Sequence, residues 1–523
     1  MIPPPLNYSK NKKGSIFMVG SHDDQTRVEL ARFEKMIKDN AQKIYKEILK
    51  QDTAILNLYR KFDGNLQLTI AEYLRKMEAE GKLKDVITDT VMNTLFVIDK
   101  RTSHIINVKE FGAAGDGICD DAGAVRNAIE HMEPGDTLYF PKGTYLILGA
   151  IEISKPNITF NGEGLIQCDY GFRIKASHFK AVGMRMEALG YSTDCRAFVI
   201  DNAAQNVNAP TTIEDFTFKD CHFKNFFYAV YAAGGSYNHD GTEAAVGYPV
   251  RDVVIENCHS VTYEDKNTGH FQCIQVENIA YINNRTYGGT NASSYNAIKG
   301  NGFIRVIGNY DHNNKYASCE IENGSGNAII ANNTFNSKIW IDDSFNAVVN
   351  ANTTKEGVHI TVGSGVGDAD NIVVSNNACR NIRCEQFGTY QGGTIKNVNI
   401  IGNIVNGDNT HGIWIHGNAV KAAKICNNFI TGTNTNDIAI QRNEQLDCYT
   451  SGNFGNGKTM LIAGTGGKVY GIDNYNMTAS GNRDSLEVSH LEKSFNGLKV
   501  TDTSGAAWRI SVNTTGEVYT SKY

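Results

Sequence analysis

Acidic side chains recur at short spacings in the middle of the chain. Glu320 and Glu322 are two residues apart, and Asp342 and Asp343 follow about twenty residues later. Residues i and i+2 of a β-strand point to the same side of a sheet. Carboxyl groups held close together repel, which raises the pKa of at least one and provides a general acid beside a base or nucleophile. Glu320, Glu322 and Asp342 are therefore predicted to be catalytic in the cleavage of a glycosidic or phosphodiester bond. The alternative is that each carboxylate only keeps the surface solvated.

Other side chains of the same segment have types suited to binding a polymer. Indole rings stack on the C–H faces of sugars, and cations hold phosphate or carboxylate groups. The predicted substrate-binding residues are Glu277, Lys299, Trp340, Asp343, His359, Arg383, Trp414 and His416. No cofactor is predicted, although Glu322, Asp342 and Asp343 are oxygen ligands of the kind that Ca²⁺ prefers.

A repeat of about 25 residues supplies the elements that must position these side chains. Short runs of Ile, Val and Asn end in an asparagine that recurs at Asn257, Asn284, Asn309, Asn333, Asn352, Asn377, Asn403, Asn428 and Asn453. Such a period of β-branched runs and turns predicts a solenoid of stacked coils, a parallel β-helix, whose asparagines bond one another. No proline follows Pro249, as expected for a chain whose backbone is almost entirely hydrogen-bonded between β-strands.

Stacking the coils with their apolar residues inside predicts which side chains share the outer surface. Val276 is placed in one inner column with Ile298, Ile321, Ile341, Ile360, Ile415 and Ile440. The flanking outer columns then hold Gln275, Ala297, Glu320, Trp340, His359 and Trp414, and Glu277, Lys299, Glu322, Asp342, Thr361 and His416. One outer strip between about 270 and 416 is expected to form the site.

Three regions are expected along the chain. Residues 1–104 carry a heptad seam, from Leu30 and Ile37 to Phe62, that fits either a parallel coiled coil or an intramolecular helical hairpin. Residues 105–485 form the β-helix. Residues 486–523 alternate and contain turn sequences typical of β-hairpins.

Composition excludes several classes of function. The net charge is −6 with no basic patch, so nucleic acid is not an expected partner. No apolar run is long enough to span a bilayer, and no secretion signal is apparent at Met1, so synthesis in a cytoplasm is expected. The eleven cysteines are scattered without a CxxC pair, which predicts buried, reduced thiols rather than a disulfide framework or a zinc site.

The start of the β-helix carries a family resemblance. Val108-Lys-Glu-Phe111-Gly112 and the following Gly115-Asp116-Gly117, then Gly135-Asp136 and Phe140-Pro141-Lys142-Gly143-Thr144-Tyr145, resemble the opening of the pectate-lyase-like superfamily. That superfamily includes phage tail spikes, pre-neck appendage proteins and polygalacturonase-like enzymes. The resemblance implies a right-handed parallel β-helix capped by an amphipathic helix over 121–132, with Asp116, Asp120 and Asp121 as turn and cap residues. The polygalacturonase active-site residues are not recognisable, so a pectin enzyme is not predicted.

The resemblance also implies a function. A helical N-terminus, a β-helix and a short β tail are similar to phage tail-spike depolymerases, which act on a capsule, an O-antigen or a teichoic acid. It implies a homotrimer, made in the host cytoplasm and attached to the virion tail or baseplate through residues 1–104. The alternatives are a non-catalytic receptor-binding adhesin with the same fold and a cellular polysaccharide hydrolase or lyase.

Overall fold

The computed structural model describes residues 8–10, 16–18 and most of 105–522. The gaps in this last range are 202–211, 238–242, 246–249, 291, 363–366, 387–392, 408–410, 417–418, 442–445, 465–467, 473, 475–476, 482–485, 488–497, 502–506 and 513–517. The chain divides into two compact units, 1–101 and 102–523. In the first unit, β1 (Tyr8–Lys10) and β2 (Ile16–Met18) pair antiparallel. The predicted heptad seam lies outside the described residues, and the predicted domain boundaries stay predictions.

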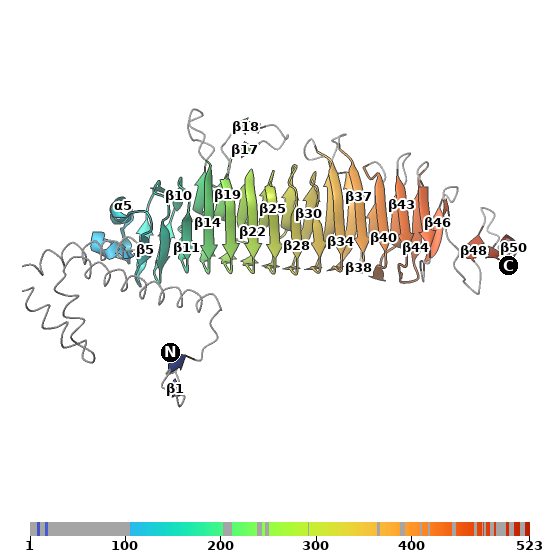
Figure 1. Cartoon of the computed structure of the whole chain (residues 1–523), viewed down its shortest axis with the longest axis horizontal. Helices are drawn as coiled ribbons and strands as arrows, with labels where there is room; N and C mark the ends of the chain where they lie inside the picture. Colours follow the sequence, from blue (N-terminus) through green and yellow to red (C-terminus); the bar gives the residue numbers. More distant parts are fainter. Residues whose placement is uncertain are drawn as a thin grey trace, which may run out of the picture. The chain divides into compact units, whose positions relative to one another are not determined.

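The second unit is a parallel β-helix whose strands stack along one axis (Figure 1). Most coils contribute one strand to each of three parallel sheets, which we call wall 1, wall 2 and wall 3 in chain order. This confirms the predicted fold class, since every wall strand pairs in parallel with the coils before and after it.

The described strands of the three walls have the following bounds. Wall 1 consists of β3 (Ile105–Asn107), β5 (Thr137–Phe140), β8 (Thr159–Gly162), β11 (Phe179–Val182), β14 (Ile213–Lys219), β19 (Val250–Glu256), β22 (Val276–Ile282), β25 (Asn301–Ile307), β28 (Ala328–Ala331), β31 (Val348–Asn350), β34 (Ala369–Ser375), β37 (Ile395–Ile401), β40 (Ala422–Cys426), β43 (Asp447–Ser451), β45 (Lys468–Ile472) and β47 (Leu486–Glu487). Wall 2 consists of β4 (Asp116–Asp120), β6 (Thr144–Ile147), β9 (Leu165–Cys168), β12 (Arg185–Ala188), β15 (His222–Lys224), β20 (His259–Val261), β23 (Arg285–Tyr287), β26 (Tyr310–His312), β29 (Thr334–Phe335), β32 (Thr353–Thr354), β35 (Ala378–Cys379), β38 (Ile404–Gly407) and β41 (Phe429–Gly432). Wall 3 consists of β7 (Ile151–Ile153), β10 (Phe172–Ile174), β13 (Arg196–Asp201), β16 (Tyr228–Ala233), β21 (Phe271–Ile274), β24 (Tyr295–Ile298), β27 (Ala317–Glu322), β30 (Lys338–Asp342), β33 (Gly357–Val362), β36 (Asn381–Gln386), β39 (His411–Ile415), β42 (Asn436–Gln441), β44 (Thr459–Ala463) and β46 (Thr478–Gly481).

Short elements lie at both ends of the β-helix. The 3-10 helix η1 (Val108–Phe111) and α5 (Ala122–His131) lie at its first coil, and the apolar face of α5 joins the core through Val125 and Ala128. The predicted cap helix is thus confirmed. Asp121 uses its carboxylate to accept from Ala114 N at 2.6 Å and Gly115 N at 3.1 Å, so it holds the glycine turn. After the last coil, β48 (Leu498–Thr501), β49 (Ala507–Val512) and β50 (Val518–Lys522) pair antiparallel. Between β16 and β19, by contrast, β17 (Ser236–Tyr237) and β18 (Glu243–Ala245) pair antiparallel.

A single apolar core runs inside the coils from Val108 to Val469. Toward the capped end it is aromatic, with ring contacts that join Phe140, Phe160, Phe172, Phe179, Phe198 and Phe218. Farther along, columns of Ile and Val replace the rings, and Ile321, Ile341 and Ile360 stack in register. Alternate residues of each strand point inward, so the outer faces of the walls carry the remaining side chains. Ten of the eleven cysteines are buried and all are free, as predicted; Cys119 is exposed.

A buried asparagine ladder runs along one corner of the coils, between walls 1 and 2. Asn309 Nδ2 donates to Asn333 Oδ1 at 3.0 Å, and Asn333 Nδ2 donates to Asn352 Oδ1 at 2.8 Å. The same contact repeats from Asn284 to Asn453, which confirms the predicted ladder over that range.

Asn257 was assigned wrongly, because Cys258 occupies the ladder position in its coil and its backbone N–H donates to Asn284 Oδ1 at 2.9 Å. The left-handed residue of this corner precedes the ladder residue, as at Asn332 with φ 57° and Asn376 with φ 55°. The ladder asparagines themselves are therefore held by hydrogen bonds and not by a left-handed backbone.

The interior also holds polar groups on the inward side of wall 2. Asp311 is 1% exposed and accepts from Thr286 Oγ1 at 2.8 Å and from Ser294 Oγ and Ser318 Oγ at 2.5 Å each. Burial raises the pKa of Asp311 to about 6, although these three hydrogen bonds act to lower it. An isolated charge here would be expensive, so the three hydroxyls compensate a buried carboxyl group.

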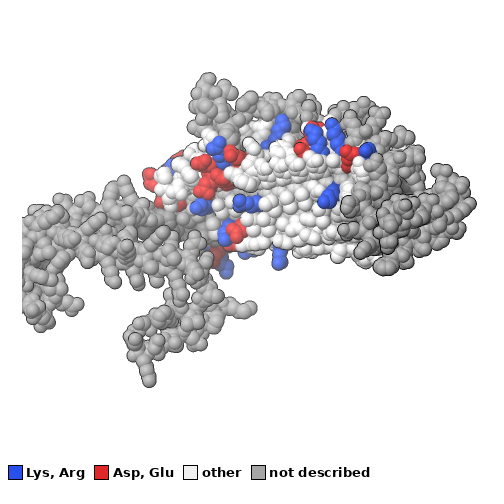
Figure 2. All heavy atoms as spheres, turned by 45° about the vertical axis from the view of Figure 1, so that its right-hand side comes forward, with Lys and Arg blue, Asp and Glu red and all other residues white. Residues whose placement is uncertain are grey.

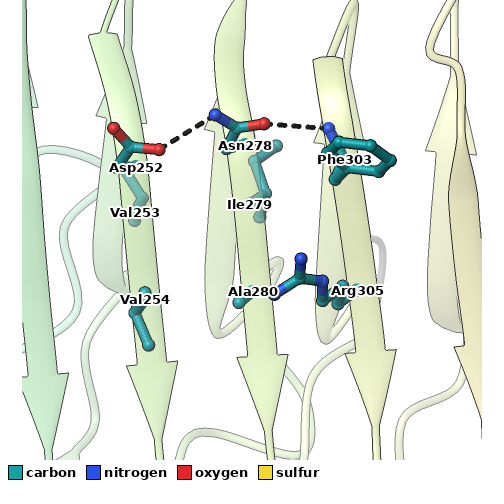
Figure 3. A pocket seen from close by; sticks show the side chains of 8 residues that line it. All are labelled: Asp252, Val253, Val254, Asn278, Ile279, Ala280, Phe303 and Arg305. Atoms are coloured by element: carbon teal, nitrogen blue, oxygen red, sulfur yellow. Dashed lines mark hydrogen bonds between the residues drawn. The ribbon is translucent and has the colours of Figure 1, made fainter.

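Wall 1 carries a shallow hollow on its outer side. It has a volume of about 240 Å³ and is lined by Asp252, Val253, Val254, Asn278, Ile279, Ala280, Phe303 and Arg305 (Figure 3). Asn278 bridges its strands, since Nδ2 donates to Asp252 Oδ1 at 2.9 Å and Oδ1 accepts from Phe303 N at 3.0 Å. Asp252 is the one carboxylate and Arg305 the one guanidinium of this lining. The hollow therefore lacks the second carboxyl group that a general acid paired with a carboxylate base would need.

Charged residues are unevenly distributed over the face that Figure 2 shows. Acidic and basic side chains gather near the N-terminal end of the described body and along one edge, with a broad uncharged area between them. Among the described residues, no helix is both long and apolar enough to cross a membrane.

Candidate active site

The predicted catalytic residues meet on the outer side of wall 3. Glu320 of β27 pairs with Trp340 of β30, and the same column continues through His359, Arg383 and Trp414 in the following coils. Glu322 and Asp342 follow Glu320 and Trp340 by two residues, so they form the neighbouring column, which continues to Thr361 and Glu385. From Glu320 onward, the structure therefore brings together the side chains that sequence stacking had grouped.

The first coils of the predicted stack are wrong. Val276 and Glu277 belong to β22 of wall 1, where Glu277 Oε2 lies 2.6 Å from Arg251 Nε. In β24 it is Ala297 that pairs with Ile321 and points inward, so Ile298 points outward. A shift of one residue along a strand exchanges its two faces, which is why the assignment failed for this coil.

Turn residues explain two further placements. Lys299 has φ 48° and Asp343 has φ 44°, so both lie in the left-handed turns that end β24 and β30. Asp343 is buried, and Lys299 is half-buried. Neither side chain belongs to the outer columns of wall 3. The position of each short turn decides which residues of the next strand point outward, and that position could not be predicted from the sequence.

Glu320 is held firmly in its site. It is 5% exposed, and its Oε2 accepts from the Ser293 hydroxyl and from Asn296 Nδ2 at 3.1 Å. Burial raises its pKa, whereas the hydrogen bond from Ser293 and the charge of Lys338 act to lower it. Glu320 thus points outward from wall 3 but lies beneath neighbouring side chains.

Glu322 is the most accessible of the three carboxyl groups. The amide nitrogen of Asn296 that bonds Glu320 also donates to Glu322 Oε1 at 3.2 Å. The two carboxylate oxygens therefore lie no farther apart than the sum of these two hydrogen bonds. Burial raises the pKa of Glu322 well above its usual range, and the charges of Glu320 and Asp342 add to that shift. Glu322 therefore holds its proton more tightly than an ordinary glutamic acid does.

Asp342 is fixed by a chain of hydrogen bonds. The indole Nε1 of Trp340 donates to Thr361 Oγ1 at 2.6 Å, and the Thr361 hydroxyl donates to Asp342 Oδ1. Burial raises the pKa of Asp342 to about 7, and the charges of Asp343 and Glu320 raise it as well. Asp342 is therefore partly ionised near neutral pH.

Lys338 and Tyr316 complete the cluster and were not predicted. Lys338 Nζ lies 4.0 Å from the ring centre of Trp340 and 5.3 Å from that of Tyr316. Burial lowers the pKa of Lys338, while the charges of Glu320, Glu356 and Glu385 act to raise it. Lys338 precedes Trp340 by two residues in one strand, so the period-two rule could have identified it. Tyr316 and Asn296 gave no such signal in the sequence. Tyr316 lies in the turn before β27, and Asn296 reaches Glu320 through the pairing register of β24 with β27.

The outer column beyond Trp340 is aromatic and basic. Arg383 lies 5.7 Å from the ring centre of Trp414, and His411 and His416 flank that ring at 5.3 Å each. His359 Nε2 contacts Asn381 Oδ1 at 3.0 Å, and burial lowers the His359 pKa to about 4. His359 is thus neutral at pH 7, so Arg383 carries the positive charge of this stretch.

No metal centre is formed by the part of the chain that the structure describes. No group of three or more His, Cys, Asp or Glu side chains in it is arranged to hold an ion. Glu322, Asp342 and Asp343, which the sequence offered as Ca²⁺ ligands, accordingly form no such group.

The fold and the wall 3 cluster together define a class of protein: a parallel β-helix with carboxyl groups and aromatic rings on one outer face. Residues 105–289 match the family model described as rhamnogalacturonase A/epimerase, pectate lyase-like. Over these residues the chain matches a pectate-lyase-like family model, in agreement with the resemblance at Val108–Tyr145.

Two named proteins and one solved structure are similar to this chain over longer stretches. The chain is 24% identical over 385 residues to the pre-neck appendage protein of Bacillus phage phi29. This alignment covers 68% of this chain and 42% of the phage protein. It is 28% identical over 228 residues to plasmin and fibronectin-binding protein A of Streptococcus pneumoniae, covering 40% of this chain and 27% of that protein. A crystal structure of pre-mature phi29 gene product 12 matches with a TM-score of 0.47 and 14% identity, covering 79% of this chain and 60% of the other. The chain thus spans less than half the length of the phage relative.

Proposed function

We propose that this protein is a phage appendage depolymerase that binds and hydrolyses a bacterial surface polymer on the outer face of wall 3. The observation that carries the proposal is the convergence of Glu320, Glu322 and Asp342 beside Lys338 and Trp340. Substrates in this class are capsular or wall polysaccharides and teichoic acids. Trp414 and Arg383 would bind the polymer farther along the same column.

Glu322 is proposed as the general acid. It is the least buried of the three carboxyl groups, and its pKa is raised well above the usual range, which favours the protonated form that an acid needs to protonate the leaving oxygen. Asp342 is proposed as the base or nucleophile, because its pKa of about 7 leaves it partly ionised near neutral pH. Glu320 is proposed to position the pair, since it shares the Asn296 amide with Glu322 and its charge acts on Asp342.

The sequence comparisons support the proposal at a coarser level. A family described by rhamnogalacturonase and epimerase activities acts on polysaccharides, and its match covers the first coils of the β-helix. The relative from phage phi29 is named a pre-neck appendage protein, which supports attachment to a virion. A homotrimer, synthesis in the host cytoplasm and attachment through residues 1–104 are proposed with it.

The decisive experiment is the Glu322→Gln variant, which keeps the shape of the side chain but cannot donate the acid proton. Incubation with purified host wall polymer, followed by chain-length analysis on gels, should show cleavage reduced about 10²–10⁴-fold while binding persists. Glu277→Gln is the matched control, because Glu277 lies on wall 1 and should leave cleavage unchanged. Full activity in Glu322→Gln would remove this site from consideration.

A non-catalytic adhesin is the second candidate. The relative named plasmin and fibronectin-binding protein A favours it, because that name describes binding alone. The same incubation separates the two, since an adhesin would retain the polymer without shortening it. If shortening occurs, an unsaturated product absorbing in the ultraviolet would indicate a lyase, and its absence a hydrolase.

A further inference from the structure

Wall 2 presents a second concentration of binding side chains on its outer side. In β15, β20, β23 and β26, the middle residues Phe223, Ser260, Thr286 and Asp311 are buried. The residues on either side of them therefore point outward. Five of these carry rings, and we call them the ring strip: His222, His259, Tyr287, Tyr310 and His312.

The rings of the strip form a continuous series. Ring centres are 5.7 Å apart for His222 and His259, 5.5 Å for His259 and Tyr287, and 5.9 Å for Tyr287 and Tyr310. His312 lies 6.2 Å from Tyr310 with nearly parallel planes, at 6°. The strip crosses four consecutive coils, or roughly 14 Å at about 4.8 Å per coil. It is long enough to contact more than one ring of a polymer.

Cations accompany the rings. Arg185, which pairs with His222 across the wall, and Arg285, which pairs with both His259 and Tyr310, are both exposed. The Arg285 backbone N–H donates to Cys258 O at 2.8 Å, whereas its guanidinium makes no ion pair with another described residue. The acidic side chain on these outer columns is Glu187, and Lys224 pairs with it at 2.5 Å. The strip thus keeps uncompensated positive charge in a chain whose net charge is −6.

His259 offers a further polar group. Its Nε2 is buried and has no hydrogen-bond partner among the described residues. Burial, His222 and Arg285 lower the His259 pKa, so the ring is neutral at pH 7 and can exchange a hydrogen bond with a hydroxyl group.

The same wall lacks these features farther along. The outward column that holds His222, His259, Arg285 and Tyr310 continues as Thr334, Thr353, Ala378, Ile404 and Phe429. The tyrosines and imidazoles are therefore concentrated on four coils, whereas the column farther along ends in Phe429, whose ring centre lies 5.3 Å from that of Phe454.

We propose that the ring strip is a binding site for an anionic glycan, separate from the wall 3 cluster. Sugar faces would stack on Tyr287 and Tyr310, their hydroxyl groups would bond His259, and carboxylate or phosphate substituents would pair with Arg285 and Arg185. The site holds a polymer without acting on its bonds, because the strip itself contains no carboxyl group. It does not depend on the catalytic function proposed for wall 3.

Affinity electrophoresis of the full chain tests the site. Native gels contain polygalacturonate, phosphorylated dextran, unmodified dextran or polyphosphate. The wild type should be slowed by one or both charged glycans, and which of them acts identifies the substituent. Arg285→Ser combined with Tyr287→Ser should weaken the apparent affinity about tenfold or more, the loss expected for one aromatic contact and one charged contact.

Control variants make the result specific. Arg305→Ser combined with Tyr449→Ser removes the same two residue types from the outer side of wall 1 and should bind as the wild type does. Arg285→Ser alone, at an exposed position, repeats the test with little risk to folding.

Three results would overturn the proposal. The first is that neither charged glycan slows the wild type. The second is that the double variant migrates as the wild type does. The third is that polyphosphate slows the protein as strongly as the glycans with no dependence on Tyr287, which would mean that charge alone is bound.

Discussion

The outer faces of wall 3 and wall 2 belong to the same β-helix but present their polar residues in opposite ways. On wall 3, Glu320, Trp340 and Asp342 are each at most 5% exposed, and hydrogen bonds link each to its neighbours. On wall 2, Tyr287, Tyr310 and Arg285 stay partly or fully exposed, and ring contacts dominate. Burial shifts the carboxyl pKa values on wall 3 by large amounts. The difference indicates that one face is suited to proton transfer and the other to holding a polymer.

The largest expected effect is a loss of free energy of unfolding. It tests whether the outer side chains of wall 3 are packed like a protein core while those of wall 2 are not. Trp340→Ala should lower the free energy of unfolding by about 3–5 kcal/mol, because a buried indole and its bond to Thr361 are lost. Tyr310→Ala on wall 2 should cost about 1 kcal/mol or less, since that ring is half-exposed. Denaturant unfolding of both variants measures the difference. Equal losses would show that the two faces are packed alike.

The next prediction concerns the carboxyl group inside the coils. Asp311 has a pKa of about 6 when folded and an ordinary value of 3.8, so the folded state binds more protons between these pH values. Stability should therefore fall as pH rises from about 4 to 7, by about 3 kcal/mol for this group.

Asp311→Asn removes that contribution, because the amide resembles the neutral acid and cannot ionise. Unfolding of the wild type and the variant at pH 4, 5, 6 and 7 should give curves that diverge in slope over this range. The exposed Asp252→Asn change on wall 1 is the control and should follow the wild type. A parallel pair of curves for Asp311→Asn would mean that this carboxyl group is not shifted by burial.

The smallest effect sharpens the assignment within wall 3. If Asp342 acts as the base or nucleophile, the cleavage rate rises as pH increases through about 7. Glu320 raises the Asp342 pKa through its charge, so Glu320→Gln should move this limb of the pH profile to lower pH. A substitution that only disturbed packing would reduce the rate without moving the limb. Tyr310→Ala on wall 2 should leave the profile in place.

The sequence by itself determined the architecture. A period of about 25 residues with one asparagine per coil can satisfy its backbone and its amides only by stacking, which fixed the ladder from Asn284 onward. The period of two along a strand placed Glu320 and Glu322 on one face, and Trp340 and Asp342 beside them. The opening at Val108–Tyr145 identified the capped end because its turns require those glycines and the apolar side of α5.

Only the tertiary structure decided what the turns and loops contribute. The left-handed residues Gln275 and Lys299 lie in the turns that end β21 and β24. A shift of one residue moved Ala297 inside, and the turn at Gln275 places Glu277 on wall 1. Tyr316 and Asn296 reach Glu320 from other segments, and their hydrogen bonds act to lower the Glu320 pKa that burial raises. The ring strip likewise depends on register, since its side chains are up to 90 residues apart in the chain and meet only because successive coils stack directly.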